Sequence, residues 1–180
     1  FGGAPPFFVG FKWPTKSRQP LGFLACIDLA SLPSDSGIDW LLMDGLLLFF
    51  YDMEEKPWGF DPKDREGWKV IFVPATTVLS RESTPPANLK TEWQVKKRGI
   101  EFVSVSLPPP WERDEIAALK MSDAEMDRFI EFRSNLYESA PHHQIGGHAD
   151  PVQRAHMDLE CQLVSNGLYC GDSSGYEAPR

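Results

Sequence analysis

The chain has 180 residues, which is the length of a single domain, and 42% of them are apolar, enough to build a hydrophobic core. Sixteen prolines, 14 glycines and three cysteines exclude a collagen-like chain, general disorder and a disulfide scaffold. The 26 acidic and 18 basic residues give a net charge of −8, and an acidic surface repels phosphate groups, so we expect no nucleic-acid partner.

Four segments have the composition of β-strands. Leu21–Leu29 is an apolar run, and Gly45–Asp52 holds six consecutive large apolar residues, as in a strand buried on both faces. Trp68–Pro74 ends at a proline, which cannot donate to a strand ladder. Gly99–Leu107 alternates apolar and polar residues and stops at a run of prolines. We predict a strand in each segment.

Two amphipathic helices are predicted in the C-terminal third of the chain. Ser122 and Glu125 have the spacing of a capping box, and an apolar stripe with helical spacing follows them. Asp150 is expected to cap the second helix, with Pro151 in its first turn and Gln153 in the box position. Asn166-Gly167 is expected to end that helix in a left-handed turn.

All four histidines lie between His142 and His156, close to Asp150 and Glu160. Imidazole and carboxylate groups are zinc ligands, and His156 and Glu160 would share a helix face, with His148 nearby. The spacing matches no metal-binding motif, however, so we predict no metal and no cofactor. A metal site formed by His148, His156 and Glu160 remains the alternative.

Gly146-Gly147 lies just before the expected Asp150 cap. Two glycines ahead of a helix can cradle an anion, but a carboxylate at the cap would repel one, so a structural turn is the favoured interpretation. The polar residues of this turn and cap are nevertheless the predicted binding residues: His143, Gln144, Gly146, Gly147, Asp150 and Gln153. No catalytic residue is predicted, because no pair of titratable groups has catalytic spacing.

The order of these motifs resembles the YwqG-like proteins, a bacterial family of unknown function. The likeness lies in Phe1-Gly2-Gly3, in Pro20–Leu29, in the apolar runs at 45–52 and 68–72, and in His143–Gly147 followed by Asp150–Gln153. The resemblance implies a compact α+β domain with a mainly antiparallel sheet, and it supplies no catalytic residues. The family continues into further strands after the point where this chain stops, so we expect one YwqG-like domain over residues 1–180 that is truncated at both ends.

Cellular location follows from three features. The longest strongly apolar run, Leu46–Tyr51, is far shorter than the roughly 20 residues that cross a bilayer, so no membrane partner is expected. The first residues lack the pattern of a signal peptide. Three cysteines are an odd, sparse set that suits a reducing compartment, and we predict a cytoplasmic protein.

We therefore expect a non-enzymatic module that binds a protein or a small-molecule ligand. The resemblance adds an immunity or antitoxin role, since some YwqG-like proteins occur near toxin genes and an acidic protein can neutralise a basic toxin. The alternative is a metal-dependent hydrolase that uses the histidines between His142 and His156 together with Asp150.

Overall fold

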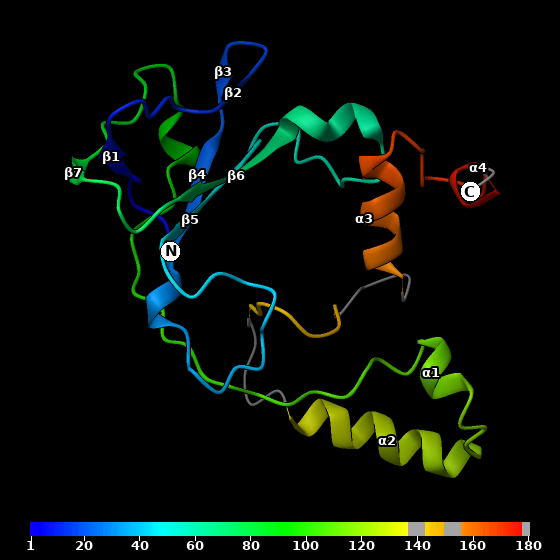
Figure 1. Cartoon of the computed structure of the whole chain (residues 1–180). Coiled ribbons are helices and arrows are strands. Elements are labelled where there is room, and N and C mark those ends of the chain that lie inside the picture. Colours follow the sequence, from blue (N-terminus) through cyan, green and yellow to red (C-terminus); the bar gives the residue numbers. More distant parts are fainter. Residues whose placement is uncertain (137–142, 150–155, 178–180) are drawn as a thin grey trace.

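A three-stranded antiparallel sheet is the centre of the computed structural model, which describes residues 1–136, 143–149 and 156–177 (Figure 1). Its strands are β4 (Gly22–Asp28), β5 (Leu46–Tyr51) and β6 (Trp68–Val73), in the order β4-β5-β6. These are the first three strands predicted from the sequence, and the fold is α+β as expected. β5 is the central strand, which suits its six large apolar residues: Leu48 and Phe50 are buried and the other four are partly buried.

The hydrophobic core lies on one face of this sheet. Leu48 and Phe50 of β5 are almost completely buried against Leu21, Phe23 and Val73. The aromatic side chains that precede the sheet cover this face: Phe8, Phe11 and Trp13. The indole nitrogen of Trp13 donates to the backbone oxygen of Leu21 at 2.8 Å, which satisfies the polar end of a ring that is otherwise packed in the core.

Two short ladders flank the sheet. β1 (Pro6–Phe8) pairs antiparallel with β7 (Leu79–Glu82), and β2 (Thr15–Lys16) pairs with β3 (Gln19–Pro20). Phe1–Gly3 lies along the outer edge of β4, where the amide of Gly2 donates to the carbonyl of Leu24 at 2.7 Å. One edge of the sheet is therefore covered by the chain's first residues.

The predicted strand at Gly99–Leu107 is wrong. In the part of the chain that the structure describes, this segment pairs with no strand, and Val103 and Val105 are exposed. The segment makes contacts elsewhere: just before it the amide of Arg98 donates to the Phe1 carbonyl at 2.7 Å, and within it the Ser104 hydroxyl donates to Asp35 at 2.9 Å. A strand requires a neighbour for its backbone groups, and the alternation in the sequence could not reveal that none is present here.

Both predicted helices of the C-terminal third are present. α2 (Asp123–Asn135) begins at the capping box of Ser122 and Glu125, as predicted. α3 (Met157–Ser165) ends at Asn166-Gly167, where the amides of Gly167 and Leu168 donate to the carbonyls of Val164 and Leu163, and Gly167 has a φ of +85°.

The start of α3 differs from the prediction. His156 is the N-cap of this helix, so the helix begins later than the Pro151 start expected from the sequence. The expected cap at Asp150 and the box residue Gln153 lie outside the described residues.

The remaining helical elements are short. α1 (Asp114–Ala117) and α4 (Ser174–Glu177) are single α-helical turns. Three further turns are 3-10 helices: η1 (Leu29–Ser31), η2 (Pro62–Gly67) and η3 (Thr91–Trp93). None of the helices within the described residues is long and apolar enough to cross a bilayer.

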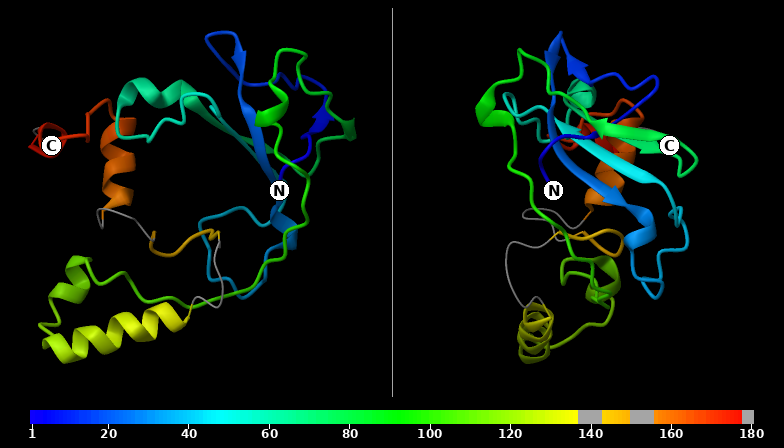
Figure 2. Two further views of the ribbon diagram at one scale, coloured as in Figure 1. Left: turned by 180° about the vertical axis from the view of Figure 1, so that it is seen from behind. Right: turned by 90° about the vertical axis from the view of Figure 1, so that its left-hand side faces the viewer.

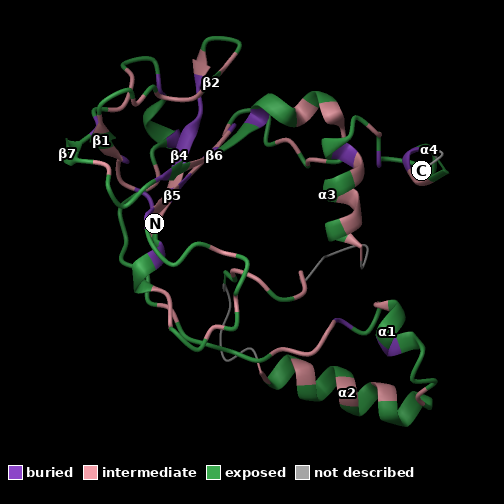
Figure 3. Cartoon of the chain, in the orientation of Figure 1, coloured by how far each residue is buried: buried purple, intermediate pink, exposed green. Residues whose placement is uncertain are grey.

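The helices do not form a layer on the sheet. Figure 2 shows α1 and α2 well away from the strands in both views, and Figure 3 shows the buried residues concentrated at the sheet. The accessible surface is 12752 Å², whereas a compact protein of this mass exposes about 8,800 Å². The arrangement is thus more open than the compact domain that the resemblance implied, and it leaves apolar side chains of α2 and β6 without cover.

Candidate functional site

Four of the six predicted binding residues, His143, Gln144, Gly146 and Gly147, lie in the turn at 143–149, and Asp150 and Gln153 lie outside the described residues. Gly146 and Gly147 both have left-handed backbone conformations, with φ of +76° and +69°. The side-chain amide of Gln144 closes the turn by donating to the carbonyls of Gly146 at 3.2 Å and His148 at 2.6 Å. Gln144 therefore holds its own turn together, which agrees with the structural interpretation of the two glycines.

The turn is anchored at two points. The imidazole of His143 stacks on the ring of Phe1, with 5.2 Å between ring centroids and 27° between planes. A β-carbon on Gly146 would lie 3.0 Å from Cδ1 of Ile38, so the backbone approaches the loop before β5 closely. The turn thus contacts both the N-terminal segment and the loop that leads into the central strand.

His148 lies at a small cavity that brings together three distant parts of the chain. The cavity has a volume of about 50 Å³ and is lined by Arg113, Gly147, His148, Ala149 and Asp158. This volume accommodates water but is far below the roughly 300 Å³ or more of ordinary ligand pockets. The cavity beside the turn is therefore too small to enclose a metabolite.

Arg113 organises the charges at this cavity. Its guanidinium donates to both carboxylate oxygens of Asp158, at 3.0 and 3.2 Å, and to Glu115 at 3.3 Å. These hydrogen bonds, that to Glu115 first, raise the pKa of Arg113. Burial alone would raise the pKa of Asp158, but the hydrogen bond and charge of Arg113 and the backbone amides of Leu159 and Asp158 together outweigh it, and the pKa lies below its usual value. The carboxylates here are ionised partners of an arginine and are poorly suited to act as a general base.

The predicted metal alternative is not assembled in the described residues. No group of three or more histidine, cysteine, aspartate or glutamate side chains within residues 1–136, 143–149 and 156–177 is placed to hold a metal ion. His156 caps α3, and the carboxylate of Glu160 accepts a hydrogen bond from the Tyr176 hydroxyl. His142, Asp150 and Gln153 lie outside the described residues.

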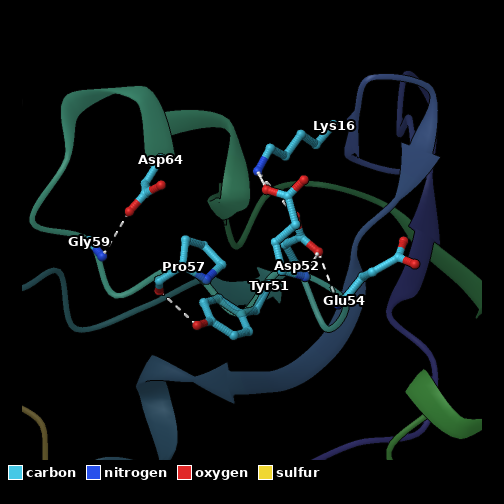
Figure 4. A network of polar contacts seen from close by, with 8 residues as sticks. Lys16, Tyr51, Asp52, Glu54, Pro57, Gly59 and Asp64 are labelled. Atoms are coloured by element: carbon cyan, nitrogen blue, oxygen red, sulfur yellow. Dashed lines mark hydrogen bonds and ion pairs between the residues drawn. The ribbon is translucent and has the colours of Figure 1, made fainter.

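A second polar cluster, which the sequence analysis missed, follows strand β5 (Figure 4). Asp52 is buried, and its Oδ1 accepts hydrogen bonds from the amides of Glu54 and Glu55, each at 3.0 Å. Its Oδ2 lies 3.3 Å from the ammonium group of Lys16, which also pairs with Glu55. The Tyr51 hydroxyl beside it donates to the carbonyl of Pro57 at 2.8 Å.

The charged groups of this cluster, Asp52 and Lys16, stabilise the fold. Burial by itself raises the pKa of Asp52, but the amides of Glu55 and Glu54 and the Lys16 ammonium group outweigh it, so the pKa lies below its usual value. The hydrogen bond to Glu55 raises the pKa of Lys16. Asp52 thereby joins the hairpin of β2 and β3 to the end of the central strand. An aspartate directly after an apolar strand was the available signal for this turn.

Residues 1–172 match a family described as a domain of unknown function, DUF1963. The chain belongs to this family. None of the curated proteins compared with it matches. A family of unknown function was expected, and the match agrees with that expectation, whereas the YwqG-like resemblance itself stays a prediction.

The close approach at Gly146 gives a first prediction. Gly146→Ala is expected to lower the free energy of unfolding by about 2 kcal/mol, because alanine is strained at this φ and its methyl group would press on Ile38. Gly37→Ala is the matched control, since Gly37 has a φ of +66° with no atom near the added methyl group. Urea denaturation should show the smaller loss for Gly37→Ala. Equal losses would mean that the Ile38 contact contributes nothing.

The Asp52 cluster gives a second prediction. Asp52→Asn should lower the free energy of unfolding by about 1–3 kcal/mol at pH 7, because Lys16 loses its buried partner. A carboxylate whose folded pKa is depressed stabilises the protein above its unfolded pKa, and this stabilisation is lost as the pH falls through the folded pKa.

The difference between wild type and Asp52→Asn should therefore shrink from pH 7 to pH 3 in urea denaturation. Asp39→Asn, at an exposed position, is the control and should match wild type at both pH values. A difference for Asp52→Asn that is independent of pH would contradict the proposed charge interaction.

Proposed function

We propose that this member of the DUF1963 family is a protein-binding module rather than an enzyme, and that α2 forms part of its contact surface. The observation that carries the proposal is the uncovered apolar surface of this helix. No residue of α2 is buried, and the Phe132 side chain is 56% exposed one helical turn from Phe129, which is only partly buried. Apolar groups gathered on one amphipathic helix of a soluble protein are typical of an interaction surface.

The charge around α2 supports a basic partner. Residues 112–136 contain seven carboxylates and four basic side chains, and one of the four, Arg113, is already paired with Asp158 and Glu115. A net negative surface around an apolar strip attracts a positively charged protein over long range, and the strip then contributes contact area. A basic toxin has this chemistry, so an immunity or antitoxin role is part of the proposal.

Small-molecule binding and hydrolysis have less support. The cavity at His148 has the volume of a water site, and its carboxylate, Asp158, is paired with Arg113. Catalysis and tight binding of small ligands both require an enclosed site with converging free polar groups. His143 and Gln144 already hold the turn at 143–149 in place. In this proposal the turn therefore makes only an accessory contact with the protein partner.

Site-specific photo-cross-linking tests the proposal. A photoreactive phenylalanine analogue placed at Phe132, in cells of the source organism, should give one discrete adduct with a second protein. The yield of this covalent adduct should fall as the salt concentration rises, because salt screens the charge attraction between the two proteins. The same analogue at Trp58, which is 81% exposed and lies in the loop between β5 and η2, is the control. No adduct at Phe132, or the same adduct at Trp58, would refute the assignment of α2.

A further inference from the structure

The outer edge of β6 is open. β6 is the last strand of the order β4-β5-β6, and no described strand pairs with its other side. Its side chains Trp68, Val70 and Phe72 are all more than one third exposed. A sheet edge with unpaired amides and carbonyls beside exposed apolar side chains is a template for an added strand, and proteins ordinarily block such an edge.

The chain also contains a segment suited to such an edge. Residues 100–105 read Ile-Glu-Phe-Val-Ser-Val, pair with no described strand, and expose Val103 to 74%. The same protein therefore presents an acceptor edge without a strand and a strand-like segment without a sheet.

The two sequences complement each other in one parallel alignment. When Glu101 is placed beside Lys69, Val103 and Val105 fall beside Ile71 and Val73 on the same face. On the opposite face, Ile100 and Phe102 fall beside Trp68 and Val70. The one mismatch is Ser104, a polar residue that falls beside Phe72. Opposite charges and apolar pairs on neighbouring strands stabilise strand pairing.

The antiparallel alternative is poorer. With Glu101 again beside Lys69, the antiparallel direction sets Gly99 beside Ile71 and Val103 beside Gly67. Two apolar pairs are then lost to glycines, which contribute no side chain to the contact. Charge and apolar complementarity together favour the parallel direction.

A single chain cannot make this contact with itself in the described arrangement. Arg98 is hydrogen-bonded to Phe1, and Phe1–Gly3 lies beyond the outer edge of β4, on the opposite side of the sheet from β6. Strands are spaced about 5 Å apart, so the path to the free edge of β6 is roughly 20 Å. At about 3.4 Å per residue, Ile100 and Glu101 are too close to Arg98 to reach Trp68 and Lys69.

We infer that two copies of this chain form a dimer in which residues 100–105 of each copy add as a parallel strand to the outer edge of β6 of the other. The exchange is reciprocal, so the same two surfaces are used in both copies and the assembly closes as a dimer. This inference is independent of the proposed role of α2, which is not part of the exchanged strands.

Sedimentation equilibrium of the full chain at several concentrations tests the inference. Wild type should be a dimer in equilibrium with monomer. Val103→Lys should raise the dissociation constant of the dimer by at least about tenfold, since it sets a charge beside Ile71 on the apolar face. Val78→Lys is the matched control: Val78 is 84% exposed between β6 and β7 and lies in neither pairing sequence.

A charge exchange tests the alignment itself. Lys69→Glu and Glu101→Lys should each weaken the dimer by about three- to fivefold, and the double variant should recover most of that loss. Thermal unfolding of the monomeric variants should match wild type at low concentration, because these side chains are exposed in the isolated chain.

A wild-type chain that is monomeric at every concentration would overturn the inference. So would a dimer that survives Val103→Lys, one that Val78→Lys disrupts equally, or single charge variants that the double variant does not restore. Cross-linking at Phe132 should be unchanged in Val103→Lys, so failure of this inference and failure of the proposed function give different results.

Discussion

The pairing of β5 between β4 and β6 is the interaction on which the rest of the described structure depends. Six large apolar residues in a row can be buried only if strands lie on both sides and side chains lie over at least one face. The N-terminal aromatic residues provide that cover, and Asp52 then fixes the end of β5 to the β2–β3 hairpin through Lys16. The hydrophobic core, the position of the β2–β3 hairpin and the Asp52 cluster therefore all depend on the placement of β5.

The same constraint determines what stays open. A central strand requires two neighbours, and each neighbour has an outer edge whose amides and carbonyls also need partners. Phe1–Gly3 satisfies part of the outer edge of β4, and residues 95–98 pair in turn with Phe1 and Gly3. Nothing in the described chain does the same for β6. Since the core lies on one face of this sheet, β6 and the separate helix α2 both keep exposed apolar side chains.

The success of the sequence analysis followed the range of each interaction. The strands at 45–52 and 68–74 and the cap at Ser122 were predictable, because an apolar run and a capping box are encoded by neighbouring residues. The strand at 99–107 was predicted wrongly for the opposite reason, since pairing depends on a partner far away in the sequence. In the candidate site, the glycine turn was anticipated from Gly146-Gly147. The link between Arg113 and Asp158 had no local signal, because 45 positions separate the two residues.

The contrast between this site and the open surfaces bears on what kind of protein this is. Several polar side chains around His148 have partners within the chain: Gln144 closes the turn, and Arg113 pairs with Asp158 and Glu115. Polar groups committed to each other rigidify a structure and are unavailable to a substrate. Exposed apolar side chains and an unpaired strand edge, by contrast, gain most from contact with another protein surface. Both proposals for this chain therefore rest on α2 and on the outer edge of β6.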